Sequence, residues 1–163
     1  MNAVYISDTN IWIDFRHAGL LEALFTLPFS LCCTDFVLNE LNDFDHGDLV
    51  ASGLQVVELD EVSIVGLTAL KALHNNSSLA DVSCYHLAKQ TGFPLLTGDG
   101  QLRKQAEKDG LQVHGAMWLL DQLVELDLIS PHQAHASLTA MLAANARLPK
   151  AECAMRLQAW SAA

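Results

Sequence analysis

The chain has 163 residues, of which 51% are hydrophobic and 17% are charged, so it can bury a core of its own. Its 19 acidic residues outnumber its 9 lysines and arginines, and the net charge of −10 excludes a protein that coats nucleic acid with a basic surface. No apolar run approaches the roughly 20 residues that cross a bilayer, and no secretory signal is visible, so we expect a cytoplasmic protein without a membrane partner.

Short apolar runs alternate with helical patterns over the first 115 residues. Strands are predicted at Ala3–Ser7, Ser30–Cys33, Leu54–Leu59, Pro94–Thr97 and Gln112–His114. Helices are predicted at Trp12–Phe25, with an interruption near Gly19, and at Phe36–Phe44, Val62–Leu73, Leu79–Lys89 and Gln101–Lys108. Such alternation predicts an α/β fold with a parallel sheet between two layers of helices.

The remaining residues have only helical patterns. One helix is predicted over Ala116–Ile129, and a second begins at Pro131 after Ser130, with Gln133 completing a capping box. Leu148 and Pro149 end that helix, and a last one follows over Ala151–Trp160. We therefore expect one domain over residues 1–163, with a core at 1–115 and a helical extension at 116–163.

Four acidic residues occupy unusual positions on this framework. Asp8 directly follows the first strand, and Asp99 follows the fourth strand after a single glycine, so both belong at the carboxyl edge of a parallel sheet, where ligands bind. Glu40 and Asp81 lie on predicted helices, beside the apolar faces that pack on the sheet. An ionised carboxylate beside a core is costly unless a partner compensates its charge.

Each of these acids also has an ordinary structural explanation. Asp8 and Asp99 could cap the helices that follow them, Ser78 and Asp81 fit a capping-box pattern, and Glu40 could be solvated. Four unrelated caps need not meet at one edge of a sheet, however. If they do meet, their mutual repulsion predicts a hard divalent cation, Mg²⁺ or Mn²⁺, which could also link this acidic protein to a phosphodiester backbone.

Three stretches of the chain resemble the PIN-domain nucleases, and in particular the VapC-type toxins of toxin–antitoxin pairs. They are VYISDTNIWI at residues 4–13, FVLNEL at residues 36–41 and LADVSCYHLAKQTGFPLLTGDGQLRKQAEKDGLQVHG at residues 79–115. The resemblance implies a PIN-like three-layer α/β/α fold with a mostly parallel sheet of four to five strands. It covers about three quarters of the chain, and the segment after Gly115 resembles the helical tail of some such proteins.

The resemblance further implies that Asp8, Glu40, Asp81 and Asp99 are the catalytic, metal-binding acids of an endoribonuclease that uses Mg²⁺ or Mn²⁺. Asn10 and Thr97 match positions that support such a site. The basic pair Arg103 and Lys104 is the nearest candidate for RNA contact, although the surface is thinly charged. The implied partners are an RNA substrate, a cognate antitoxin that neutralises the enzyme, and a second copy of the chain in a homodimer.

Two other readings remain open at the sequence level. TGDGQL resembles a motif of haloacid-dehalogenase-type phosphatases, with Asp8 as nucleophile, but that family needs a second aspartate where this chain has Asn10. A receiver-like or degenerate PIN module that binds without catalysis would leave Glu40 and Asp81 without a role. Asp43, Asp45 and Asp48 lack the ligand pattern of a calcium loop, so we expect a solvated turn there.

Overall fold

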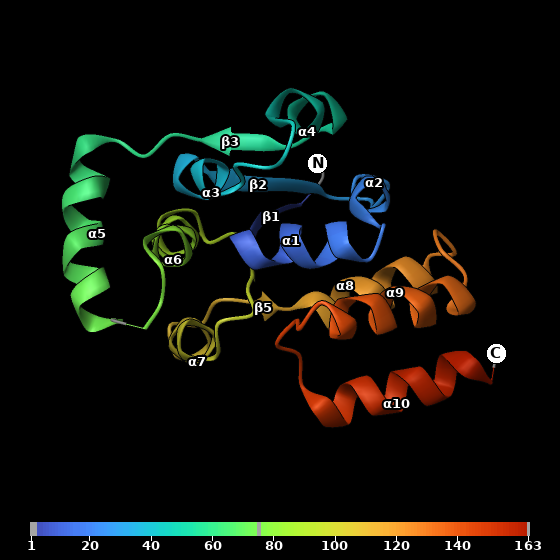
Figure 1. Cartoon of the computed structure of the whole chain (residues 1–163). Helices are drawn as coiled ribbons and strands as arrows, with labels where there is room; N and C mark the ends of the chain where they lie inside the picture. Colours follow the sequence, from blue (N-terminus) through green and yellow to red (C-terminus); the bar gives the residue numbers. More distant parts are fainter. Residues whose placement is uncertain (1–2, 75, 163) are drawn as a thin grey trace.

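The computed structural model describes residues 3–74 and 76–162, and five parallel strands form its central sheet (Figure 1). The strands are β1 (Val4–Ser7), β2 (Ser30–Thr34), β3 (Gln55–Val57), β4 (Leu95–Leu96) and β5 (Val113–His114), in the order β3-β2-β1-β4-β5. All five predicted strands are therefore confirmed, with small shifts at their ends. From β1 the chain adds β2 and β3 on one side, and it then adds β4 and β5 on the other side. The reversal point of the sheet, where the strand order changes direction, therefore lies between β1 and β4.

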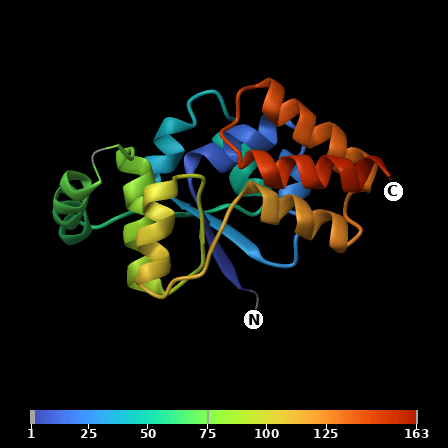
Figure 2. The same ribbon diagram turned by 90° about the horizontal axis from the view of Figure 1, so that it is seen from below.

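Helices flank this sheet, as the alternating pattern predicts. The first seven are α1 (Thr9–His17), α2 (Leu21–Leu24), α3 (Asp35–Glu40), α4 (His46–Ser52), α5 (Glu61–Leu73), α6 (Leu79–Thr91) and α7 (Gly100–Lys108). Helix α6 lies against β1, β2 and β4. Both views place α5, α6 and α7 together on one side of the molecule and the last three helices on the other (Figures 1 and 2).

The interruption predicted near Gly19 is confirmed, because the segment is divided into α1 and α2 there and the Gly19 φ of 71° lies in the left-handed region that glycine tolerates. Two other predictions in this part of the chain need correction. The helix predicted to reach Phe44 ends at Glu40, because the backbone of Leu41 leaves the helical conformation. The turn expected around Asp45 contains α4, which begins where the Asp45 carboxylate accepts a hydrogen bond from the backbone N–H of Asp48.

The C-terminal extension is a layer of three helices: α8 (Ala116–Glu125), α9 (Pro131–Ala143) and α10 (Lys150–Ser161). Helix α8 ends four residues before the predicted position. The capping box at Ser130 and Gln133 is confirmed by both of its reciprocal hydrogen bonds. Helix α9 packs on α1, α8 and α10, and its Leu138 belongs to the same hydrophobic cluster as Ile6 of β1.

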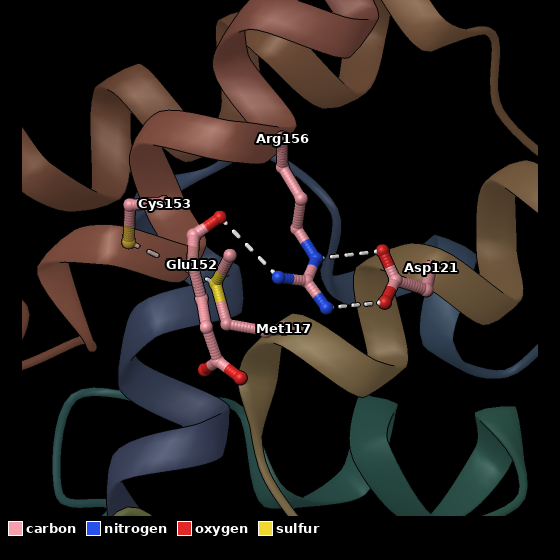
Figure 3. A network of polar contacts seen from close by, with 5 residues as sticks. All are labelled: Met117, Asp121, Glu152, Cys153 and Arg156. Carbon is pink, nitrogen blue, oxygen red and sulfur yellow. Dashed lines mark hydrogen bonds and ion pairs between the residues drawn. The ribbon is translucent and has the colours of Figure 1, made fainter.

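A bidentate ion pair attaches the last helix to this layer (Figure 3). The Arg156 guanidinium on α10 donates to both carboxylate oxygens of Asp121 on α8, at 2.8 and 2.7 Å. Beside it, the thiol of Cys153 contacts the sulfur of Met117. All four cysteines of the chain are buried and none of them forms a disulfide. Among the described residues, no helix is long and apolar enough to span a membrane.

Candidate active site

Asp8 stands at the reversal point of the sheet and is completely buried. The register of β1 on β4 pairs Ser7 with Leu96, so the residues that follow each strand meet. One oxygen of Asp8, Oδ2, accepts hydrogen bonds from the Thr97 hydroxyl at 2.8 Å and from the Gly98 N–H at 3.1 Å. The other, Oδ1, accepts from the Ile11 N–H at 3.0 Å and so caps α1. Asp8 therefore caps a helix and also lies at the carboxyl edge of the sheet, so both predictions for this residue are compatible.

Asp99 reaches the same edge from β4. Its Oδ1 atom caps α7 by accepting from the N–H groups of Gln101 and Leu102, and its Oδ2 atom accepts from the Ser77 hydroxyl at 2.6 Å. The Asp99 N–H donates to the Thr97 hydroxyl oxygen at 3.1 Å. Because the same hydroxyl donates to Asp8, Thr97 connects the two acids that follow adjacent strands.

The other two acids come from helices. Asp81 lies in the first turn of α6, where its side chain is almost fully buried, and its N–H donates to the Ser78 hydroxyl that caps the helix. Glu40 is the exposed last residue of α3, and its Oε2 atom accepts from the Thr9 hydroxyl at 2.8 Å. Thr9 directly follows Asp8, so this hydrogen bond brings the end of α3 to the start of α1.

Asp81 is electrostatically coupled to each of the other three acids. Burial and then the charge of Asp81 raise the pKa of Asp8 to about 7, against the opposing effect of its hydrogen bonds. Burial also raises the pKa of Asp81, with further contributions from the charges of Asp99 and Glu40. Among the described residues, no lysine or arginine forms an ion pair with any of the four. Within the described residues, hydrogen bonds rather than ion pairs therefore offset part of their repulsion.

A cleft of about 780 Å³ opens beside these acids. Asp81 and Asp99 line it, whereas Asp8 lies beneath the surface and Glu40 lies outside the lining. Its other walls are formed by α1, the start of α7 and the connection between α9 and α10. The lining residues from those parts include Asn10, Asp14, His17, Gly100, Gln101, Lys104, Ala144, Asn145, Ala146, Arg147 and Leu148.

The four acids do not form a ready-made coordination sphere. Within residues 3–74 and 76–162, no three His, Cys, Asp or Glu side chains converge on one point with the spacing of metal ligands. The hydrogen bonds explain this, since Asp8, Asp99 and Glu40 are each held by donors of their own. Repulsion between ionised carboxylates also favours their separation.

The expected supporting and RNA-contacting residues are distributed unevenly. Thr97 contacts Asp8, whereas Asn10 is exposed and lines the cleft. Lys104 also lines the cleft. Arg103 instead pairs with Glu107 one turn along α7, at 3.4 Å, and lies near Gly115, outside the cleft lining.

Sequence reasoning missed three polar residues of this region. Thr9 and Ser77 each donate to one of the four acids, but a hydroxyl in a loop or at a helix start has no distinguishing pattern. Asp14 lines the cleft from α1, and burial raises its pKa to about 6 against the opposing charge of His17. Its position one helical turn after Asn10 was the available signal, because both then lie on one face of α1.

Comparison with known families identifies the kind of protein to which this geometry belongs. A family model described as a PIN domain matches residues 4–162, nearly the whole chain. The chain belongs to the PIN-domain family. The PIN-like fold is thereby confirmed, and PIN domains are in general nucleases. The receiver-like reading is wrong, because receivers order their strands 2-1-3-4-5, unlike the order of this PIN domain.

Among solved structures, this PIN domain is similar to a chain in the crystal structure of VapBC2 from Rickettsia felis. In that crystal structure VapBC2 is bound to a DNA fragment from its own promoter. The identity is 14%, the match covers 69% of this chain and 98% of the other, and the TM-score is 0.45. A search of the curated proteins found no match.

Proposed function

We propose that this PIN domain is an endoribonuclease that depends on Mg²⁺ or Mn²⁺ and is the toxin component of a type II toxin–antitoxin pair. The observation that carries the proposal is the coupling of Asp81 to Asp8, Asp99 and Glu40 beside the reversal point of the sheet, where, among the described residues, no lysine or arginine forms an ion pair with any of the four. Family membership supports a nuclease, and the sequence resemblance to VapC-type toxins supports the finer assignment.

The donor set suits the proposed ions in chemical type. Carboxylates supply only hard oxygen atoms, which Mg²⁺ and Mn²⁺ prefer. Burial, and then the charges of neighbouring carboxylates, raise the pKa values of Asp8 and Asp81, so a bound cation would favour their ionised forms. Under the proposal Asp8, Glu40, Asp81 and Asp99 would hold the cation. When bound, a divalent cation supplies positive charge that favours ionisation of an attacking water and offsets negative charge on the reacting phosphate.

The surrounding residues would order the site around that chemistry. Thr97 and Gly98 hold the Asp8 carboxylate in one orientation, and Ser77 and the first turn of α7 do the same for Asp99. Asp81 and Asp99 line the cleft, so they are the acids that can reach a substrate phosphate and orient a water molecule. Asp8, which is buried, would act from beneath.

RNA cleavage tests the nuclease directly. Purified protein should cut labelled single-stranded RNA with Mn²⁺ or Mg²⁺ and not with EDTA, and Asp99→Asn or Asp81→Asn should reduce kcat/KM at least about 100-fold. Asp60→Asn is a matched control, because Asp60 caps α5 as Asp99 caps α7 and lies outside the cleft lining. Cleavage that persists in EDTA or in Asp99→Asn would refute the proposal.

A non-catalytic PIN module is the second candidate function. It is favoured by the absence, within the described residues, of three converging ligands and by the separate structural task of each acid. The two candidates differ in Mn²⁺ titration followed by calorimetry. The nuclease should bind Mn²⁺ and lose affinity in Asp81→Asn, whereas the module predicts no dependence on Asp81.

The proposed partners require a separate test. As the toxin of a pair, the protein would form a homodimer and bind a cognate antitoxin that enters the acidic cleft. A short open reading frame beside this gene should encode that antitoxin. Co-purification of the two products, with loss of ribonuclease activity in the complex, would support the assignment. A chain that is monomeric in light scattering and has no such neighbour would contradict it.

A further inference from the structure

The connection between α9 and α10 forms one wall of the acidic cleft. Its residues Ala144 to Leu148 line the cleft together with Asp81 and Asp99, although they lie some fifty residues further along the chain. In Figure 1 this orange-red connection lies on the side of the extension that faces α7. The C-terminal extension therefore contributes directly to the surface around the candidate active site.

Local hydrogen bonds and packing hold the backbone of this connection in one conformation. Asn145 adopts a left-handed φ of 64° and ends α9 with hydrogen bonds from its own N–H to the Leu142 carbonyl and from the Ala146 N–H to the Met141 carbonyl. Leu148 precedes Pro149, which restricts it to an extended backbone. Ala146 and Leu148 pack against the hydrophobic core, so the backbone of Arg147 between them is held in place.

The charges around the cleft point to a ligand for Arg147. The basic residues of the lining, histidine apart, are Lys104 from α7 and Arg147 from the α9–α10 connection, so they come from different walls. Among the described residues, neither forms an ion pair, whereas Arg16, Lys89, Arg103 and Arg156 all do. Both side chains are exposed. In a protein of net charge −10, two uncommitted cations beside a group of acids suit an anionic ligand that crosses the cleft.

We propose that Arg147 is an RNA-binding residue, which holds a backbone phosphate next to the scissile one while Lys104 holds another from a different wall of the cleft. The inference rests on the proposed ribonuclease function and extends it, because it makes the C-terminal extension part of the substrate-binding surface. Arg147 is a positioning residue here, since its guanidinium binds the RNA strand at a phosphate beside the reacting one. Its planar group suits bidentate contact with phosphate oxygens.

The test compares Arg147→Ala with Lys150→Ala. Lys150 is a matched control because it is exposed, begins α10 three residues later, forms no ion pair among the described residues and does not line the cleft. In Mn²⁺, Arg147→Ala should raise KM for a short single-stranded RNA roughly fivefold with little change in kcat, and Lys150→Ala should match wild type. Arg147→Lys should restore most of the loss, because it keeps the positive charge.

Salt dependence provides a readout that a purely structural role would not change. The slope of log kcat/KM against log salt concentration should become shallower by about 0.7 in Arg147→Ala, as expected when one phosphate contact to a single strand is lost. Fluorescence anisotropy with the same RNA, on an Asp99→Asn background that does not cleave, should show the same change in slope. Lys104→Ala should produce a similar and additive change.

Two failures can be distinguished. If wild-type protein cleaves RNA and Arg147→Ala has the KM and salt slope of wild type, the inference is wrong and the proposed function stands. If wild-type protein neither cleaves nor binds RNA, the proposed function fails and the inference fails with it. Equal losses in Arg147→Ala and Lys150→Ala would also overturn the inference, since the effect would then be one of overall charge.

Discussion

The Thr97 hydroxyl holds two of the candidate catalytic acids together. It donates to the Asp8 carboxylate at 2.8 Å and accepts from the Asp99 N–H at 3.1 Å, and Thr97 is 1% exposed. Because water cannot replace the hydroxyl at this depth, its loss would leave a buried acceptor and a donor without this partner. The contact therefore matters for stability as well as for the geometry of the site.

Replacement of Thr97 by valine, which has nearly the same shape, should lower the free energy of unfolding by about 1–3 kcal/mol, because both hydrogen bonds are lost. Urea denaturation monitored by circular dichroism measures this change. Thr97→Ser keeps the hydroxyl and should be much closer to wild type. If Thr97→Val is as stable as wild type, the hydroxyl does not join the two acids in solution.

Asp81 should destabilise the metal-free protein at neutral pH. Burial raises its pKa in the folded state, with the charges of Asp99 and Glu40 adding to the effect, so folding is favoured when Asp81 is protonated. This stability is fully present below the unfolded pKa, near 3.8, and is lost as the pH rises through the folded pKa. Asp81→Asn removes the charge and should therefore be more stable than wild type at alkaline pH.

Thermal unfolding in EDTA tests this prediction. The Tm advantage of Asp81→Asn should be several degrees at about pH 8 and should shrink as the pH falls through the raised folded pKa of Asp81, because wild-type Asp81 then takes up a proton. Asp60→Asn, at an exposed helix cap, is the control and should show no such advantage at alkaline pH. A lower Tm for Asp81→Asn at every pH would mean that the favourable position of the charge in the first turn of α6 dominates.

At the scale of elements, the sequence predicts strands better than short helices. Each predicted strand is a short apolar run bounded by polar residues. Such runs form strands in the structure because the sheet buries their side chains. Helix α4 was missed because seven residues that include Gly47 hold no apolar period, and only the Asp45 cap marks its start. The overextension of α3 past Glu40 has a related cause, since the apolar spacing continues to Phe44 although the backbone turns at Leu41.

One ion pair that helps to attach α10 could not be predicted from the sequence. Arg156 and Asp121 lie 35 residues apart, on the last and first helices of the extension, and no local pattern relates them. Both side chains are less than a third exposed, and the contact is bidentate. Arg156→Ala should therefore lower the free energy of unfolding by about 1–3 kcal/mol, mainly by loosening α10.

Hydrogen exchange would locate this effect. Amides of α10 should exchange faster in Arg156→Ala, whereas those of β1 and β4 should keep the protection of wild type. Lys150→Ala, which removes an exposed cation from the same helix, should leave the exchange of α10 unchanged. Uniform loss of protection across the sheet would instead show that the extension and the sheet unfold together.

The whole molecule shows why the candidate site could be predicted only in part. Strand order and register bring Asp8 and Thr97 to one edge, and that much follows from parallel α/β topology. The cleft wall formed by the α9–α10 connection follows from packing of the extension against α1, which no motif encodes. Two of the four acids, Asp8 and Asp99, are also helix caps, because a cap at a strand end fixes the carboxylate at that edge.

Binding of Mn²⁺ should stabilise the whole protein, and more strongly as the pH rises. A ligand at about 100 times its Kd adds about 2.7 kcal/mol, or roughly 5–10 °C in Tm for a chain of this size. The acids must be ionised to bind, and the pKa of Asp8 is raised to about 7, so protons compete with the cation below that pH. The Tm increase should therefore be largest at about pH 8 and small at about pH 5, as measured by differential scanning fluorimetry. Asp60→Asn should behave as wild type, whereas Asp81→Asn should lose most of the increase. An increase that is equal at both pH values, or equal in Asp81→Asn, would show that Mn²⁺ binds elsewhere on this acidic surface.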